Sequence, residues 1–303
     1  MRADASGRRA LLRAFVAATI AISFSGFPRH ARANTWAERI KALEKACAGR
    51  LGVYALDTAT HQFIAWRADE RFGMCSTFKL LLVAAILREA DAARLSLATV
   101  LRYTKADMVP HAPITEQHLA DGGMSIDALA EAAQTTSDNV AANLLIRHLG
   151  GPAKVTALIR EMGDKETRLD RYETELNLVP AGELRDTTTP LAMASTVARV
   201  MTGKFLSSDA RMRLRAWMIA TETGKRRLRA GLPTDWIAGD KTGTAAAAAM
   251  PNKHNDVAVI WPPNRAPIVV AAYLDASGHF ESTRAEDDEV LAQVGRVVAQ
   301  WMA

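Results

Sequence analysis

Strand-like segments stand near both ends of this 303-residue chain, and helix-like segments fill its middle. Short runs rich in β-branched and aromatic residues predict strands, and apolar residues at helical spacing predict helices. This order predicts an α/β fold of the α+β type, in which a five-stranded antiparallel sheet is built from both termini, flanked by helices, with an all-helical domain inserted. The predicted strands span residues 50–57, 61–67, 236–242, 256–261 and 268–275.

The predicted strands and helices together divide the chain into two domains. Residues 34–68 and 221–303 are expected to form the α/β domain and residues 69–220 the all-α domain, with a site between the two. The expected helices span residues 35–48, 77–93, 125–134, 139–149, 152–162, 190–201, 208–220 and 284–302.

The first 33 residues predict an export signal peptide. Arg8, Arg9 and Arg13 precede an apolar stretch at 14–24, and the small residues at 31–33 fit a cleavage site. The paired arginines also resemble a twin-arginine signal, so the Sec and twin-arginine routes both stay open. The expected location is the periplasm.

The basic excess lies entirely in this leader. The whole chain has 38 basic and 33 acidic residues and a net charge of +5. Removal of residues 1–33 takes away six arginines and one aspartate, which leaves 32 of each sign. The mature protein is therefore expected to bind neither nucleic acid nor membrane.

Two cysteines, Cys47 and Cys75, remain in a protein destined for an oxidising compartment. Sequence provides no geometry for a disulfide, and two cysteines make no framework, so small buried thiols are the preferred interpretation.

Ser76 and Lys79 stand three residues apart at the start of an apolar run. In a helix they lie one turn apart on the same face. Burial lowers the proton affinity of such a lysine, and an easily deprotonated amine beside a hydroxyl favours a nucleophilic serine. A solvated lysine beside a capping serine is the structural alternative.

Three later segments combine polar groups in ways that suit catalysis. Ser137-Asp138-Asn139 offers a hydroxyl and an amide, or simply a helix cap. Glu173 with Asn177 suits the activation of a water, or belongs to a polar surface loop. The segment 241–244, Lys-Thr-Gly-Thr, suits carboxylate recognition, or ends an ordinary strand.

Taken in order, these motifs resemble those of the class A serine β-lactamases, from about residue 36 to the C-terminus. Ser76-x-x-Lys79, Ser137-Asp138-Asn139 and Lys241-Thr242-Gly243 form the triplet of class A β-lactamases and penicillin-binding proteins. Glu173-x-x-Leu176-Asn177 resembles the acidic-loop motif that separates the lactamases from their relatives.

The resemblance implies a set of catalytic roles. Ser76 corresponds to the nucleophile that opens the lactam ring, and Lys79 helps to deprotonate it. Glu173 corresponds to the base for deacylation, and Ser137 to the hydroxyl that protonates the leaving nitrogen. Whether Lys79 or Glu173 is the acylation base stays open.

The resemblance also implies the surroundings of the substrate. The backbone N–H groups of Ser76 and Thr244 correspond to the oxyanion hole. Arg171 and Asp186 correspond to a salt bridge that closes the acidic loop. The usual strand position for a carboxylate-binding arginine, matched here to Asp256-Val257, has none, so Arg227 is expected to replace it, unless its basic run is a solvated helix end. The implied substrate-binding residues are Asn139, Asn177, Lys241, Thr242, Thr244, Arg227 and His111, the last at a gate position.

Two departures from the family pattern concern the segment after Thr244. Carbapenemases of the family pair a cysteine at the position of Cys75 with one at the position of Ala245, so that disulfide is not expected. The hairpin 245–254 is longer than usual and contains five consecutive alanines. Such a loop either widens or partly occludes the site.

The function implied is hydrolysis of penicillins and cephalosporins by a monomer that needs neither metal nor cofactor, and hence antibiotic resistance. Its expected partners are β-lactam substrates and inhibitors. A penicillin-binding D,D-peptidase and a β-lactam sensor without turnover are the alternatives. Glu173 with Asn177 discriminates the lactamase from the peptidase, and the expected cleavable leader, with no other transmembrane segment expected, argues against a membrane sensor.

Overall fold

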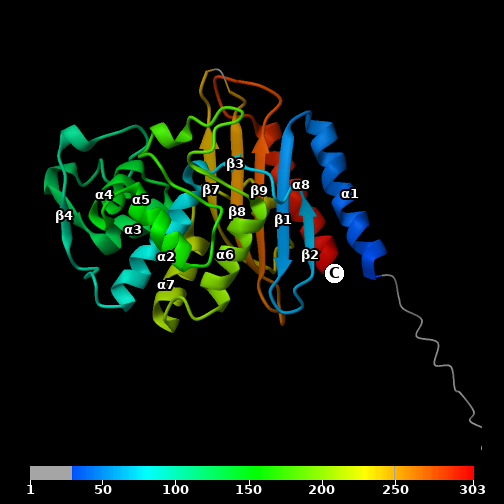
Figure 1. Ribbon diagram of the computed structural model, residues 1–303, viewed down its shortest axis with the longest axis horizontal. Helices are drawn as coiled ribbons and strands as arrows, with labels where there is room; N and C mark the ends of the chain where they lie inside the picture. Colours follow the sequence, from blue (N-terminus) through cyan, green and yellow to red (C-terminus); the bar gives the residue numbers. More distant parts are fainter. Residues whose placement is uncertain (1–28, 249) are drawn as a thin grey trace, which may run out of the picture.

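The protein is built on one five-stranded antiparallel sheet of strand order β2-β1-β9-β8-β7. The computed structural model describes residues 29–248 and 250–303. The strands are β1 (Arg50–Asp57), β2 (Phe63–Trp66), β7 (Ile237–Ala245), β8 (Lys253–Trp261) and β9 (Ile268–Asp275). Strands from both ends of the chain therefore pair side by side, as predicted (Figure 1).

Alternation along the strands divides the interior into two cores. On β8, Val257 and Val259 belong to one cluster, while Ala258 and Ile260 belong to the other. This follows from the two-residue period of a strand, which points successive side chains to opposite faces of the sheet. Both faces are covered, so the second half of β8, residues 257–261, is a continuous apolar run.

Helices from the two termini cover one face of the sheet. Helix α1 (Arg29–Cys47) and α8 (Ala285–Met302) lie together over the strands at the right of Figure 1. Ile40 and Leu291 join this core and are fully buried. The structure begins α1 at Arg29, before the predicted residue 35. Residues 1–28, which include most of the predicted signal peptide, lie outside the described residues.

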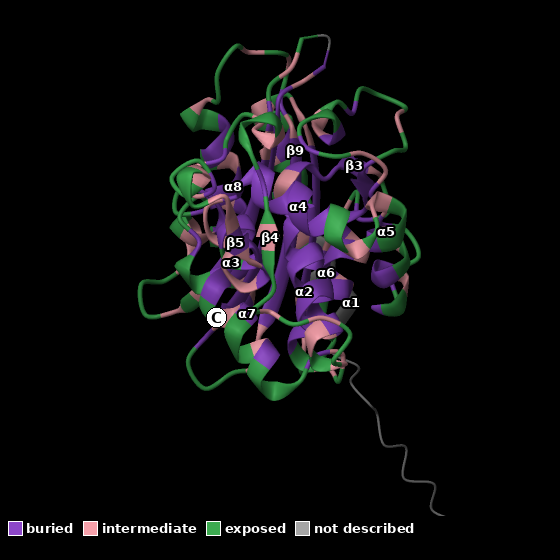
Figure 2. Cartoon of the chain, turned by 90° about the vertical axis from the view of Figure 1, so that its left-hand side faces the viewer, coloured by how far each residue is buried: buried purple, intermediate pink, exposed green. Residues whose placement is uncertain are grey.

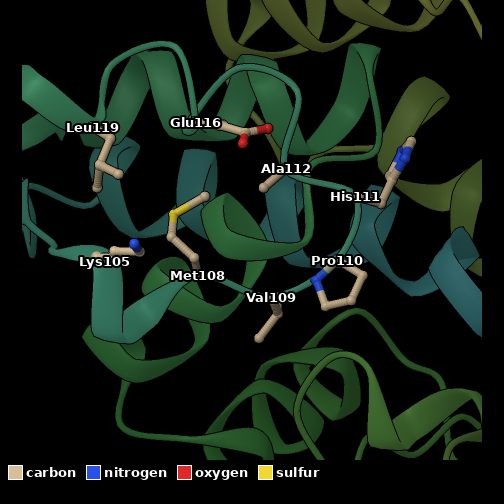
Figure 3. A pocket seen from close by; sticks show the side chains of 8 residues that line it. All are labelled: Lys105, Met108, Val109, Pro110, His111, Ala112, Glu116 and Leu119. Carbon is tan, nitrogen blue, oxygen red and sulfur yellow. The ribbon is translucent and has the colours of Figure 1, made fainter.

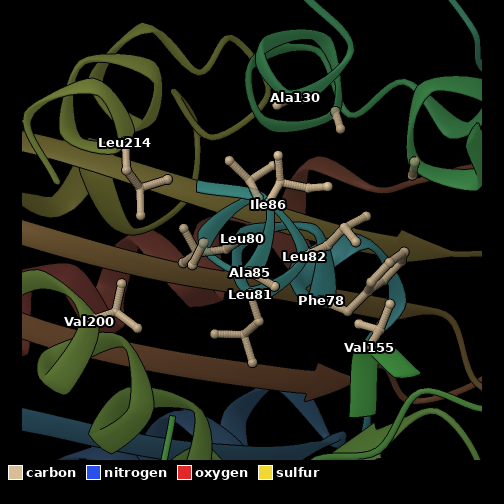
Figure 4. Packing of buried hydrophobic residues seen from close by; sticks show 14 of the residues in the cluster. Phe78, Leu80, Leu81, Leu82, Ala85, Ile86, Ala130, Val155, Val200 and Leu214 are labelled. Atoms are coloured by element: carbon tan, nitrogen blue, oxygen red, sulfur yellow. The ribbon is translucent and has the colours of Figure 1, made fainter. Parts of the chain in front are cut away.

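The other face packs against helices from the middle of the chain. Helix α2 (Phe78–Asp91) is buried along most of its length, because other helices surround it (Figure 2). Figure 4 shows Leu80, Leu81, Leu82 and Ile86 of α2 among side chains of the neighbouring helices. These are α3 (Ile126–Thr135), α4 (Asn139–Leu149), α5 (Pro152–Glu161), α6 (Pro190–Thr202) and α7 (Ser208–Ala220).

Short elements complete the described fold. The strands β3 (Phe72–Gly73) and β6 (Thr187–Thr188) pair with each other, as do β4 (Val100–Arg102) and β5 (Gly123–Ser125). Neither pair was predicted, because two or three residues show no period. The five-stranded sheet and the inserted helices agree with the predicted fold class, and the domain boundaries after residues 68 and 220 stay a prediction.

Candidate active site

Ser76 and Lys79 lie where a one-turn 3₁₀ helix, η1 (Cys75–Thr77), leads into α2. Ser76 is half-buried, whereas the Lys79 side chain is fully buried. The turn before α2 makes no side-chain cap, so the alternative of a capping serine beside a solvated lysine is wrong.

The Lys79 ammonium is surrounded by hydrogen-bond acceptors. Its Nζ donates to the Ser137 carbonyl oxygen at 2.7 Å and to Asn139 Oδ1 at 2.5 Å, and it lies 3.0 Å from Glu173 Oε1. Burial lowers the pKa of Lys79, while the charge of Glu173 and its hydrogen bond oppose that shift. The amine is thereby prepared for proton exchange with its neighbours.

Glu173 connects Ser76 to this lysine. Ser76 Oγ donates to Glu173 Oε1 at 3.2 Å, and Asn177 Nδ2 donates to Glu173 Oε2 at 2.7 Å. Asn177 Oδ1 is buried and has no protein partner among the described residues. The predicted pairing of Glu173 with Asn177 is therefore present, with one free acceptor beside it.

Asn143 is a site residue that the motifs did not reveal. Its Nδ2 donates to the Glu173 carbonyl oxygen and its Oδ1 accepts from the Glu173 N–H, each at 2.9 Å. These two bonds attach the backbone of Glu173 to Asn143, which lies on α4. The signal available in the sequence was a buried polar residue one turn after Asn139 on the same helix.

Ser137 lies between the two buried lysines of the site. Lys241 Nζ donates to Ser137 Oγ at 2.9 Å, and Lys79 Nζ lies 3.4 Å from the same oxygen. Burial first, and then repulsion from Lys79, lowers the pKa of Lys241 to about 7. The Ser137 hydroxyl thus has a proton donor on each side.

A strap formed by Pro110 and His111 is hydrogen-bonded to the outer side of the Ser137-Asp138-Asn139 turn and to the adjacent Thr136. Asp138 Oδ1 caps α4 by accepting from the Ala141 N–H at 2.8 Å, so the cap predicted as an alternative is present as well. Asn139 Nδ2 donates to the Pro110 carbonyl oxygen, and His111 Nε2 lies 3.0 Å from the Thr136 carbonyl oxygen.

The exposed His111 is one of the residues that line a cavity of about 320 Å³ beside this strap. Its ring points away from the other labelled side chains (Figure 3). The strap therefore connects the predicted gate residue directly to the turn that includes Ser137 and Asn139.

Strand β7 reaches the nucleophile because residue 243 is glycine. A Cβ at Gly243 would lie 2.6 Å from the Met74 carbonyl oxygen and 3.2 Å from the Ser76 nitrogen. A larger residue would push the strand away. The absence of a side chain lets β7 pass close to the backbone of Met74 and Ser76.

Arg227 is buried behind this strand rather than solvated. Its Nη2 donates to Thr244 Oγ1 at 2.7 Å, and its Nε donates to Asp288 Oδ1 at 2.7 Å. The alternative of a solvated basic run is therefore wrong for Arg227, although its neighbour Arg226 is 83 % exposed. Thr242, the other predicted carboxylate ligand, lies 2.6 Å from Thr223, oxygen to oxygen.

The acidic loop is closed by an ion pair between Arg171 and Asp186. Arg171 Nε lies 2.6 Å from Asp186 Oδ2, and the Asp186 side chain is fully buried. Asp186 Oδ1 also accepts the N–H groups of Asp170 and Arg171. The predicted salt bridge is thus part of a hydrogen-bonded junction at the base of the loop.

Several residues around the site adopt left-handed backbone conformations that side chains disfavour. The φ angles are 45° for Cys75, 62° for His111, 63° for Ser137 and 56° for Asp186. Strained backbone of this kind clusters at functional sites, where surrounding contacts maintain it.

The long hairpin folds back onto the residue before the nucleophile. Met250 is buried and forms a small apolar cluster with Cys75 and Ala245. Strand β8 begins at Lys253, so the predicted loop to residue 254 was too long. Both cysteines are free thiols, Cys75 buried and Cys47 half-buried, and burial raises the pKa of Cys75 to about 12.

Within residues 29–248 and 250–303, no cluster of three or more histidine, cysteine or acidic side chains suits a metal ion. In the same residues, no helix combines the length and apolar character needed to cross a membrane.

Comparisons with known proteins agree with this geometry. Residues 35–302 match the model of the β-lactamase enzyme family. β-Lactamase CTX-M-97 of Escherichia coli is 43% identical over 283 residues, 93% of this chain and 94% of the relative. β-Lactamase AST-1 of Nocardia asteroides is 45% identical over 260 residues, 86% of this chain and 81% of the relative.

A solved structure of an ancestral class A β-lactamase is 50% identical and superimposes with a TM-score of 0.83, over 88% of this chain and 99% of that structure. Because these similarities cover most of the chain, and because all four sequence motifs meet at one buried site, the protein belongs to the β-lactamase enzyme family as a class A member.

Proposed function

We propose that Ser76 is the nucleophile and Glu173 the general base with which this class A β-lactamase hydrolyses the lactam ring. The supporting observation is the hydrogen bond from Ser76 Oγ to Glu173 Oε1 at 3.2 Å. No other acceptor for this hydroxyl is present among the described residues. In acylation the proton of Ser76 passes to Glu173 while Oγ bonds to the lactam carbonyl carbon.

The proton then has a route to the leaving nitrogen. Lys79 Nζ lies 3.0 Å from Glu173 Oε1 and 3.4 Å from Ser137 Oγ. Ser137 gives its proton to the lactam nitrogen as the C–N bond breaks, the Lys79 ammonium replaces the proton on Ser137, and Glu173 passes the proton taken from Ser76 to Lys79. The N–H groups of Ser76 and Thr244 stabilise the oxyanion during this step.

Deacylation uses the other side of Glu173. The free Oδ1 of Asn177 and a Glu173 carboxylate oxygen together suit the binding of one water. Glu173 takes a proton from this water as the water oxygen bonds to the ester carbonyl carbon, and it returns a proton to Ser76 Oγ as the bond between that carbon and Oγ breaks. A penicillin-binding D,D-peptidase would carry out this second step only slowly on a lactam, and a sensor would not turn the lactam over.

The substrate carboxylate is assigned to the end of β7. Lys241 supplies positive charge, and the hydroxyls of Thr242 and Thr244 supply hydrogen bonds, with Arg227 behind Thr244. Asn139 Nδ2 has a second hydrogen for the side-chain carbonyl of the substrate. His111 is exposed and stands as the gate on the opposite side.

Mass spectrometry after addition of a penicillin tests the two catalytic roles separately. Ser76→Ala is expected to show no adduct and no turnover. Glu173→Gln is expected to accumulate the acyl-enzyme, because its amide does not accept a proton from water. Acylation is expected to be slower in this variant too, but a long incubation still allows the adduct to form. Rapid turnover by Glu173→Gln would refute the role of Glu173.

We further propose that the protein is exported to the periplasm after cleavage near residue 33 and acts there as a monomer. N-terminal sequencing of the periplasmic form tests the cleavage. Replacement of both Arg8 and Arg9 by lysine is expected to stop export only if the route is the twin-arginine one. Light scattering of the purified protein tests the monomer.

A further inference from the structure

A fully buried histidine lies next to the site, and the proposed reaction does not use it. His254 on β8 is the direct neighbour of Thr244 on β7 in the strand register. Its Nδ1 lies 3.4 Å from Asp288 Oδ1, and its Nε2 lies 3.4 Å from Asp287 Oδ2. Both carboxylates belong to the first turn of α8, so the imidazole lies between this helix and the strand.

Asp288 is shared between His254 and Arg227. The Arg227 Nε donates to the same Asp288 Oδ1 at 2.7 Å. Burial alone would raise the pKa of the Asp288 carboxyl, but the hydrogen bonds from His254 and Arg227 and the charge of Arg227 hold this pKa well below its usual range. Asp288 is therefore a charged and fixed anchor for the guanidinium.

The remaining donors of Arg227 reach the strand pair that borders the substrate. Nη1 donates to the carbonyl oxygens of Gly243 at 3.0 Å and Asn255 at 2.8 Å, and Nη2 donates to Thr244 Oγ1 at 2.7 Å. Because a guanidinium only donates, the Thr244 oxygen is the acceptor in that bond. The Thr244 hydroxyl hydrogen is thereby left for an acceptor on the substrate.

Helix α8 and the segment after Arg227 are in backbone contact. A Cβ at Gly231 would lie 2.0 Å from the Ala292 carbonyl oxygen, and a Cβ at Gly295 would lie 2.2 Å from that of Leu228. Neither position has room for a side chain. The close backbone contact therefore limits how far the acids of α8 and the guanidinium of Arg227 can move apart.

We propose that His254 is a positioning residue for the substrate-carboxylate site. Its imidazole fixes Asp288, Asp288 fixes Arg227, and Arg227 directs the Thr244 hydroxyl toward the carboxylate. This inference rests on the proposed role of Thr244 and Arg227 in binding that carboxylate. If His254 only filled space in the core, its replacement would change stability but not the recognition of the carboxylate.

His254→Asn tests the proposal, because asparagine is polar but too short to lie between both acids. The probes are a penicillin and its carboxylate methyl ester. For the penicillin, KM is expected to rise about tenfold with kcat changed less than twofold, which is the signature of lost ground-state binding. For the ester, KM is expected to match that of the unaltered protein. His279→Asn, at an exposed histidine, is the matched control and is expected to change neither.

A double-mutant cycle identifies the path. Since His254 acts through Arg227, the variant with both His254→Asn and Arg227→Ala is expected to have a KM within twofold of Arg227→Ala alone. Additive effects, or an equal rise in KM for the ester, would overturn the proposal. If His254→Asn does not fold, Asp287→Asn replaces it and is expected to raise KM for the penicillin by a smaller factor. An unchanged KM in that folded variant would also overturn it.

The Arg227→Ala variant distinguishes failure of the proposed carboxylate site from failure of the proposed role of His254. An unchanged KM in Arg227→Ala refutes the proposed carboxylate site itself. A raised KM in Arg227→Ala, with an unchanged KM in His254→Asn, refutes only the positioning role of His254.

Discussion

Burial determines the protonation chemistry of the two lysines in the site. Both side chains are fully buried and lie on either side of Ser137. Lys79 has a carboxylate partner in Glu173, which opposes the effect of burial on its pKa. Among the described residues no carboxylate lies within salt-bridge distance of Lys241, and burial and the charge of Lys79 lower its pKa to about 7. The two lysines thus suit different tasks, proton transfer for Lys79 and a titrating positive charge for Lys241.

The pKa of Lys241 predicts an alkaline fall in kcat/KM for an anionic penicillin. Below about pH 7 the Lys241 amine is charged and attracts the carboxylate of the penicillin. Above this pH the amine is neutral and attracts the carboxylate less strongly. A bound carboxylate favours the charged form, so the fall in kcat is expected at higher pH than the fall in kcat/KM. Lys241→Arg keeps its charge throughout this range and is expected to lose the alkaline fall in kcat/KM. The same alkaline limb in Lys241→Arg would contradict the assignment to Lys241.

The motifs located the reacting groups but not the residues that hold them. Ser76, Lys79 and Glu173 stand in recognisable local patterns. Asn143 and His254 do not, because their roles depend on partners 30 or more residues away, Glu173 for the first and Asp288 for the second. Buried polar residues of this kind are identifiable only once the fold brings their partners together.

Among the elements, the period of apolar residues predicted the long helices and the central strands well. Residues 139–149 and 208–220 match α4 and α7, and residues 50–57 match β1. The start of β8 was predicted three residues late, at 256. Lys253, His254 and Asn255 are polar and resemble a loop, yet all three are buried with polar partners. Tertiary hydrogen bonds, rather than strand propensity, extend β8 there.

The hairpin between β7 and β8 is fixed at both of its sides. Met250 packs on Cys75, and Asn252 bonds to the segment after β9, where its Nδ2 donates to the Phe280 carbonyl oxygen at 2.9 Å. The loop is therefore part of the wall behind the nucleophile. In place of a covalent link between Cys75 and residue 245, an apolar contact holds this region together.

Met250→Ala is expected to lower both stability and activity. Loss of a buried methionine side chain costs roughly 2 kcal/mol or more of unfolding free energy. Because the cavity opens beside Cys75, the adjacent Ser76 is expected to lose alignment and kcat to fall roughly tenfold. Urea titration and steady-state kinetics measure the two effects. Ala246→Ser, at an exposed position of the same loop, is the control. Normal kcat in a destabilised Met250→Ala would show that the hairpin does not position the nucleophile.

At the scale of the whole molecule, one sheet separates two cores with different relations to the site. The core that includes α2 contacts the elements of the active site directly. The core between the sheet, α1 and α8 brings the two termini together on the far face (Figure 1). Both cores include strand residues from the two ends of the chain, but only the second includes the terminal helices α1 and α8.

Two matched truncations are expected to separate stability from catalysis. Ile40 on α1 and Leu81 on α2 are both fully buried, one in each core. Replacement of either by alanine leaves a cavity and costs roughly 2–5 kcal/mol of unfolding free energy, measured by urea titration. Leu81→Ala is expected to lower kcat as well, because Leu81 lies two residues after Lys79 on the helix that places its ammonium. Ile40→Ala is expected to keep kcat within twofold in the folded protein, because the whole sheet lies between its cavity and Ser76. An equal loss of kcat in the two variants would mean that strain crosses the sheet and that the two cores act as one.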